Sequence, residues 1–294
     1  MANTDYHGIN HDVRVVNGKT IYLPPWAAAQ EGWGNMKLPD LSLAAHSVQQ
    51  FPIGTRYVNG DRAYRYARAG GTLRTDLLGK IGQIQCIKYC SIQATALQYA
   101  TTIAVTVGST DGHAGDGVVA VNELAGGYIL IFDATYTGGQ PQVIQIRSNT
   151  VVASSGGTMT LVTDEGVQNA LTTDDHAELI ASPYRNILAQ ASLAYSNTYG
   201  HIGRPVIPAT SGQFLWVQTW GPCFLSPQTD VGVNTGGSGA GQNYVVVSRH
   251  DGSIDTLLYS DATHDQAQIV GFVMACATTA GGQGAPFVFL TIAP

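Results

Sequence analysis

Charged side chains are scarce in this sequence. Asp, Glu, Lys and Arg make up 12% of its 294 residues, only 14 residues are Lys or Arg, and the net charge is −6. Globular proteins usually carry about twice that charged share. A surface that binds phosphate groups needs clustered Lys and Arg, so the composition predicts no nucleic-acid partner. Uncharged polar residues and Gly must cover the surface instead. This is typical of a chain that works inside a large assembly, or of an extracellular β protein.

Cysteine is also sparse, with Cys86, Cys90, Cys223 and Cys276 only. This density is too low for a disulfide framework, and a chain of this size does not need one. Cys86 and Cys90 lie four positions apart without a matching second pair, which argues against a zinc site. The sequence therefore predicts buried thiols, in keeping with assembly in a reducing cytoplasm.

Targeting and membrane segments are missing as well. The start, Met1 to His7, has no basic region followed by an apolar stretch, so we expect no secretory signal. No uninterrupted apolar run approaches the roughly 20 residues of a membrane-spanning helix. We expect a chain that is made in the cytosol, is soluble and has no membrane partner.

Motifs for catalysis and for ligands are equally poor. No Ser lies in a strand-to-helix elbow, and no Gly-rich stretch continues into the Lys-Ser or Lys-Thr of a phosphate loop. His7 and His11 could hold a metal only on a helix, and Gly8 and Asn10 beside them favour an irregular segment. The loop 111–117 lacks the ligand spacing of a calcium site. We expect no enzyme, no cofactor and no metal.

Short apolar and β-branched segments between Gly-rich turns fill the chain from about residue 100 onward. Such a pattern predicts an all-β fold, a barrel or a sandwich, rather than alternating strands and helices. Short helical turns are expected at 73–84 and 164–171. The clearest predicted strands are 102–107, 127–133, 142–147, 158–162, 177–180, 213–220, 244–248, 269–275 and 287–292.

The first 50 residues read as an extended N-terminal arm. Asn17-Gly18 supplies the positive φ angles of a tight turn, which predicts a small hairpin over 13–23. A second hairpin is expected around Asn59-Gly60-Asp61. We expect residues 51–294 to form the β-rich core, which could divide into two subdomains meeting near 190–210. A turn is expected at Gly221-Pro222, between strands 213–220 and 223–225.

Four aromatic residues are candidates for an interface: Trp26, Trp33, Tyr64 and Tyr66. The two tryptophans lie in a proline-bearing irregular segment, where they could anchor the arm to another surface or fold back on the chain's own core. The tyrosines alternate with arginines along one predicted strand. A solvated or interface-facing strand face accounts for these basic residues better than a nucleic-acid strip. The basic series is Arg56, Arg62, Arg65, Arg68 and Arg74.

Three stretches carry a resemblance to a known group. They run from Val105 through 127–133 to 145–149, over 182–187, and over 203–206 followed by 212–222. Together they resemble uncharacterised structural proteins of tailed bacteriophages, of the head decoration or cement type. The resemblance covers roughly residues 50 to 225 and is a pattern of strands and turns, without any active site to transfer.

The resemblance implies a virion protein that is made in the host cytoplasm and binds the outside of the capsid. Its expected partners are the major capsid protein and further copies of itself, with a homotrimer expected. The first alternative is a fibre or receptor-binding protein that recognises host glycans, which an exposed aromatic platform and a low copy number would indicate. A major capsid protein would need more helix and charge. A cell-surface carbohydrate-active enzyme would need a signal peptide.

Overall fold

The computed structural model describes most of the chain, and the chain divides into two units. Unit 1 is centred on the continuous segment Gln83–Pro183, and unit 2 combines Arg14–Tyr22, Met36–Gly82 and Tyr184–Pro294. Each unit is treated by itself below. The described residues are 13–23, 41, 44–82, 85–132, 141–153, 155–189, 200–227, 245–249, 251–257, 268–276 and 286–294.

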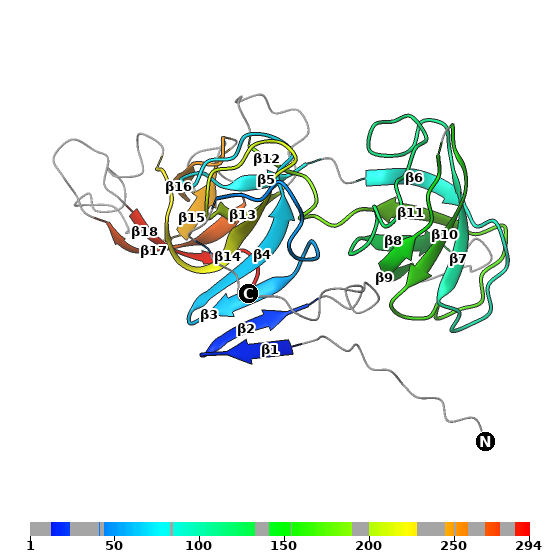
Figure 1. Cartoon of the computed structure of the whole chain (residues 1–294), viewed down its shortest axis with the longest axis horizontal. Coiled ribbons are helices and arrows are strands. Elements are labelled where there is room, and N and C mark those ends of the chain that lie inside the picture. Colours follow the sequence, from blue (N-terminus) through cyan, green and yellow to red (C-terminus); the bar gives the residue numbers. More distant parts are fainter. Residues whose placement is uncertain are drawn as a thin grey trace, which may run out of the picture. The chain divides into compact units, whose positions relative to one another are not determined.

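Unit 1 is a six-stranded antiparallel sheet in the order β6-β11-β8-β9-β10-β7 (Figure 1). A bridge between Ile92 and Val105 joins the two ends of this sheet, and the Gln93 N–H donates to the Ala104 carbonyl at 2.8 Å. The two end strands of the sheet therefore meet at this bridge, and the sheet curls into a barrel. Its strands are β6 (Gln85–Ser91), β7 (Thr102–Val107), β8 (Tyr128–Phe132), β9 (Gln142–Asn149), β10 (Gly157–Thr163) and β11 (His176–Ile180).

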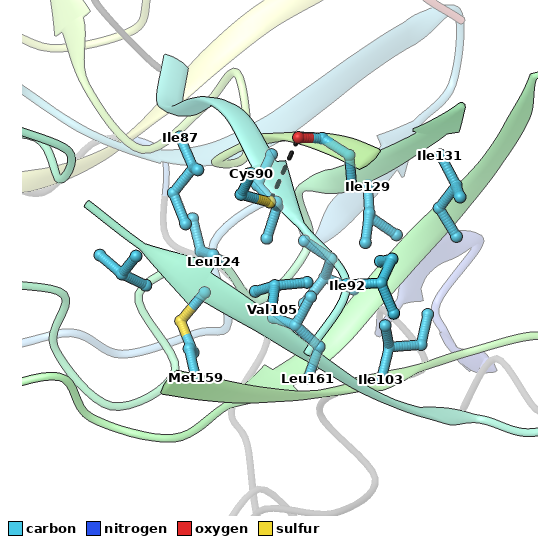
Figure 2. Close-up of a cluster of buried hydrophobic side chains, with 14 of the residues drawn as sticks. Ile87, Cys90, Ile92, Ile103, Val105, Leu124, Ile129, Ile131, Met159 and Leu161 are labelled. Atoms are coloured by element: carbon cyan, nitrogen blue, oxygen red, sulfur yellow. Dashed lines mark hydrogen bonds between the residues drawn. The ribbon is translucent and has the colours of Figure 1, made fainter. Parts of the chain in front are cut away.

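Branched aliphatic side chains fill the interior of this barrel. Every second residue of β7 points inward, so Ile103, Val105 and Val107 are all buried. Figure 2 shows this cluster, in which Cys90 lies among the aliphatic side chains. The Cys90 thiol donates to the Ala177 carbonyl at 3.2 Å, and burial raises the pKa of this thiol to about 12. Cys90 is thus a packing residue that stays protonated at neutral pH.

Unit 2 is built on a 12-stranded sheet with the main order β1-β2-β3-β4-β14-β18-β17-β15-β16. A branch leaves β14, where β13 pairs with β14 and also with β5, and β5 in turn pairs with β12. The strands are β1 (Val13–Val16), β2 (Lys19–Tyr22), β3 (Arg56–Asn59), β4 (Arg62–Arg68), β5 (Gly79–Ile81), β12 (Ile187–Leu188), β13 (His201–Pro205), β14 (Phe214–Phe224), β15 (Val245–Ser248), β16 (Ile254–Thr256), β17 (Ile269–Cys276) and β18 (Pro286–Thr291).

Two aliphatic clusters and one aromatic cluster pack against this sheet. One aliphatic cluster gathers Leu78 with the inward side chains of β14 to β18, among them Cys223. Burial raises the pKa of the Cys223 thiol to about 11, so the second described thiol is also buried, as the sequence predicted. The other aliphatic cluster comprises Ala67, Ala69, Leu73, Ile187, Ile202, Ala209, Leu215 and Val217.

The all-β prediction is confirmed, and so are both early hairpins. β1 and β2 flank Asn17 and Gly18, whose φ angles are +51° and +74°, and β3 pairs with β4 around Gly60 at φ +58°. β2 also pairs with β3, so the hairpin of the predicted arm is an integral part of the unit 2 sheet. Trp26 and Trp33 of the predicted arm lie outside the described residues, whereas His46, also in this arm, forms a bridge with Phe214 of β14.

The helical turns expected at 73–84 and 164–171 are absent from the described residues. Residue 73 instead forms a bridge with Ala209, and β5 begins at Gly79. A Cβ at Gly79 would lie 2.5 Å from Ile187 Cγ2, so the close approach of β12 requires glycine here. Tertiary pairing therefore decides the conformation of 73–84, where local propensity favoured a helix.

The turn expected at Gly221-Pro222 is also absent, because β14 runs through it as one strand of 11 residues. The register with β4 shifts between Gln218 and Trp220, which is the sign of a β-bulge. Gly221 has φ +93°, and a Cβ there would lie 2.1 Å from the Asp61 carbonyl oxygen. The bulge and this glycine let the strand bend without ending.

The division into units also differs from the expected one. The predicted meeting point near 190–210 falls inside unit 2, whereas the unit boundaries lie at 82/83 and 183/184. β5 and β12 flank these boundaries and pair through Ile81 and Ile187. The chain thus leaves and re-enters unit 2 on neighbouring strands, which is the geometry of an inserted domain.

Candidate interaction surface

The structure places Tyr64 and Tyr66 inside unit 2, not on its surface. Tyr64 is 3% exposed and Tyr66 is fully buried. Both faces of β4 are covered, because Ala63 and Ala67 on the opposite face are buried too. A strand buried on both faces offers no ring to a partner. These two tyrosines are therefore core residues, and the structure does not expose them for an interface.

The buried tyrosines belong to an aromatic cluster around Trp216. The Trp216 ring centroid lies 5.1 Å from those of Phe51 and Tyr66 and 5.7 Å from that of Tyr57. Strand register produces this cluster, because Trp216 lies opposite Tyr66 and Tyr57 lies opposite Tyr64. Rings at such distances and tilted angles gain stacking energy beyond their buried area. The cluster therefore stabilises the β3-β4-β14 part of the sheet.

Burial raises the pKa of Tyr66 to about 12, although backbone N–H groups of Gln50 and Phe51 act to lower it. The free phenol value is 10.0, so the folded state disfavours the phenolate and the unfolded chain does not. This contribution to stability is complete below the unfolded pKa and is lost as the pH rises through the folded pKa.

We therefore expect unit 2 to lose stability as the pH rises from about 10 to about 12, which promotes unfolding in that range. Tyr66→Phe removes the ionisable group and should shift this alkaline unfolding to higher pH. Circular dichroism together with phenolate absorbance during an alkaline titration measures both events. Phenolate formation by all 14 tyrosines at the free value, with the fold intact, would contradict this expectation.

The basic residues of the first hairpins serve mainly to pack the chain. Arg56 lies over the Tyr22 ring at 5.0 Å, and Arg65 lies over the Tyr184 ring at 5.8 Å. Arg65 also donates from Nη1 to the Gly54 carbonyl at 3.3 Å. Such cation–π contacts contribute to stability without any external partner.

A different surface of unit 2 exposes large apolar side chains. β18 alternates between the two faces of the sheet, and both sets of its residues are apolar except for Thr291 on the outer face. Val288 and Leu290 point inward and are fully buried, while Phe287 and Phe289 lie on the outer face. Phe287 is 41% exposed.

Neighbouring strands extend this outer face. Phe224 of β14 lies directly opposite Phe287, and Phe272 of β17 lies opposite Phe289. The Phe272 and Phe289 rings stack at 5.2 Å between centroids, and Trp220 meets Phe289 edge-on at 5.5 Å. We call this set the outer aromatic face. Its members are Trp220, Phe224, Phe272, Phe287 and Phe289.

The outer aromatic face is exposed and uncharged. Phe224 is 41% exposed and Phe272 is 43% exposed, and Met274 beside them on β17 is 47% exposed. β14, β17 and β18 contain no Asp, Glu, Lys or Arg. Sheets that face water normally carry polar side chains on that side. A contiguous exposed apolar face of this kind is a candidate site of interaction with another molecule.

Sequence reasoning identified these three strands but missed the face that they share. The available signal was the run Phe287 to Leu290, in which both alternating sets are apolar. Such a run fits a strand covered on both faces, so the sequence alone could not show that one side faces solvent.

The aspartates of two acidic loops accept hydrogen bonds from backbone N–H groups of the same loops. Asp111 Oδ2 accepts from the Gly108 N–H at 2.7 Å, as expected for a turn residue. Asp175 is 1% exposed, and its Oδ2 accepts from the Thr172 N–H at 2.7 Å. Within the described ranges, no three His, Cys, Asp or Glu residues gather as metal ligands would. His7 and His11 lie outside those ranges.

Two further findings bear on function. Among the residues placed by the structure, no helix has the length and apolar character to cross a membrane. Comparison of the chain with protein-family models, with curated proteins and with solved structures finds no match.

Proposed function

We propose that this chain is a structural virion protein, which binds the outside of a tailed-phage capsid and stabilises the shell. The observation that carries the proposal is the outer aromatic face, where Phe224, Phe272 and Phe287 are each more than 40% exposed on strands without a charge. The resemblance of residues 50–225 to decoration or cement proteins of phage heads supports it. The role is binding, not catalysis.

The proposed partners are the major capsid protein and further copies of this chain in a homotrimer. Burying the outer aromatic face against a protein would remove apolar area from water at roughly 25 cal/mol per Å². Only the surplus over the ordering costs appears as affinity, so a single contact could be weak. The contacts of many copies on a lattice would add up, so a protein with few charges could stabilise a shell. The chain would be synthesised in the host cytoplasm.

The copy number of the chain on purified particles tests this proposal first. Quantitative mass spectrometry should find hundreds of copies per particle if the chain covers the shell. A handful of copies would move the role to the fibre or tail tip. Complete absence from the particles would contradict a structural role and would reopen the enzyme hypothesis.

Variants of the outer aromatic face test the surface itself. Phe272→Ser combined with Phe287→Ser should weaken co-sedimentation with shells that lack the chain by about tenfold or more, because central apolar contacts dominate binding energy. Val121→Ser combined with Val151→Ser is the matched control, since these unit 1 side chains are 63% and 57% exposed. If both double variants lost binding to the shells equally, the outer aromatic face would not be a specific binding surface.

One observation favours the alternative of a fibre protein that binds host glycans. On unit 1, the exposed Tyr89 ring stacks on His176 at 4.4 Å between centroids. His176 in turn lies opposite Phe132, which is 36% exposed. An exposed ring platform beside polar groups suits sugar stacking. Binding of the purified chain to a glycan array, abolished by Tyr89→Ser, together with a low copy number would favour this role.

A further inference from the structure

The loop between β6 and β7 of unit 1 displays two large apolar side chains. Leu97 is 81% exposed and Tyr99 is 74% exposed, the highest values among the large hydrophobic side chains that the structure describes. The residues on either side behave in the opposite way, because Ala96 is buried and Ala100 packs against the barrel core. The side chains of Leu97 and Tyr99 thus face solvent, although the residues on either side of them are anchored to the barrel.

This loop is rigidly held. The Tyr99 N–H donates to the Val167 carbonyl at 2.7 Å, and the Val167 N–H donates back to the Ala100 carbonyl at 3.0 Å. Ala96 and Leu171 exchange two further backbone hydrogen bonds, at 3.1 and 2.7 Å. The Gln98 side chain donates to the Gln168 carbonyl at 2.8 Å. Val167 and Leu171 are themselves core residues, so the barrel fixes the position of the loop.

The backbone at Tyr99 is also strained. Its φ of +68° lies in the left-handed region, which bulky side chains rarely adopt. The opposing segment approaches so closely that a Cβ on Gly166 would lie 2.5 Å from the Tyr99 carbonyl oxygen. Glycine would satisfy position 99 without strain. A tyrosine here therefore carries a backbone strain that glycine would avoid, and strain of this kind is found where a function requires the side chain.

We propose that Leu97 and Tyr99 form a preformed docking knob, which enters an apolar pocket on a shell subunit. Rigid side chains lose little conformational freedom on binding, and aromatic and aliphatic anchors of this kind dominate interface energies. The Tyr99 hydroxyl would take a hydrogen-bond partner within the pocket. This inference rests on the proposed function and deepens it, because it assigns unit 1 an attachment point of its own, in addition to the outer aromatic face of unit 2.

The neighbourhood of the knob favours a protein over a membrane as its partner. Segments 92–102 and 166–172 contain no Lys or Arg. Peripheral membrane contacts usually combine apolar side chains with basic residues that attract anionic lipids. An uncharged knob on a fixed backbone matches a pocket of defined shape. Two attachment points, one on each unit, would let one molecule hold two shell subunits, with the gain in avidity that linked contacts provide.

The test is co-sedimentation of the full chain with shell particles assembled without it. Leu97→Ser combined with Tyr99→Ser should raise the Kd by about 30-fold or more, as expected for loss of hot-spot side chains. Val121→Ser with Val151→Ser should leave the Kd unchanged. Tyr99→Gly separates binding from folding, because it should keep or raise the melting temperature while it weakens binding.

The outcomes are distinguishable. If the wild-type chain binds and the Leu97/Tyr99 variant binds equally well, the docking knob is refuted and the proposed function stands. If the wild-type chain does not bind these particles at all, both fall. A Tyr99→Gly protein that melts well below the wild type would show that tyrosine serves the fold, and would overturn the inference. Sedimentation of the wild-type chain with phosphatidylcholine vesicles, lost in the variant, would overturn it in favour of a membrane contact.

Discussion

Trp216→Ala is expected to lower the free energy of unfolding of unit 2 by about 3–5 kcal/mol, the usual cost of truncating a buried aromatic side chain. Trp216 is 4% exposed, and its ring contacts Phe51, Tyr57 and Tyr66. These residues come from three separate segments of unit 2. Removing the ring leaves a cavity that the surrounding strands cannot close, since β4 is held by β3 on one side and β14 on the other.

Amide hydrogen exchange measures this effect unit by unit. Protection should fall in β3, β4 and β14 and should persist in the unit 1 barrel, whose core is a separate cluster. Trp216→Phe should recover much of the loss, because a smaller ring still fills part of the site. Phe272→Ala is the control for removing an exposed ring, with Phe272 at 43% exposure. A loss shared equally by both units would mean that the core of unit 2 is not independent.

Asn149→Ala is expected to destabilise unit 1 by about 2–4 kcal/mol, because it removes three hydrogen bonds of a buried side chain. Asn149 is 3% exposed at the end of β9. Its Oδ1 accepts from the Leu124 N–H at 2.8 Å, and its Nδ2 donates to the Ala120 carbonyl at 2.8 Å and the Thr150 carbonyl at 2.9 Å. The amide therefore ties the turn that precedes β8 to β9, and alanine would remove the side-chain partner of the buried Leu124 N–H.

Urea denaturation followed by circular dichroism measures the loss, and hydrogen exchange locates it. Asn149→Asp distinguishes the role of the amide oxygen from that of the amide nitrogen. Aspartate keeps an acceptor for the Leu124 N–H but loses the hydrogen bonds to the two carbonyl groups. It should also be destabilising, since a carboxylate would face two carbonyl oxygens. Asn169→Ala, at an exposed position of the same unit, should change stability by less than about 0.5 kcal/mol. Similar losses of stability in the Asn149 and Asn169 variants would refute this role of the Asn149 side chain.

Local chemistry determined much of the fold. Asn-Gly and similar pairs set tight turns through backbone conformations that glycine and asparagine adopt readily, so both early hairpins were predictable. Alternating and β-branched segments predicted β7, β9 and β10 closely, because side chains in a strand point to opposite faces in turn. The lack of helical periodicity predicted an all-β chain. The burial of Cys90 and Cys223 followed from their sparse distribution.

Only the tertiary structure decided which apolar residues face solvent. Tyr64 and Phe287 are both aromatic residues within strands, yet the first is 3% exposed and the second 41% exposed. Strand pairing between distant segments makes this difference, since β4 is covered on both faces and β18 on one. The same non-local pairing turned 73–84 away from a helix and placed unit 1 as an insertion between β5 and β12. Sequence patterns report the period of a strand, whereas long-range contacts determine what covers each of its faces.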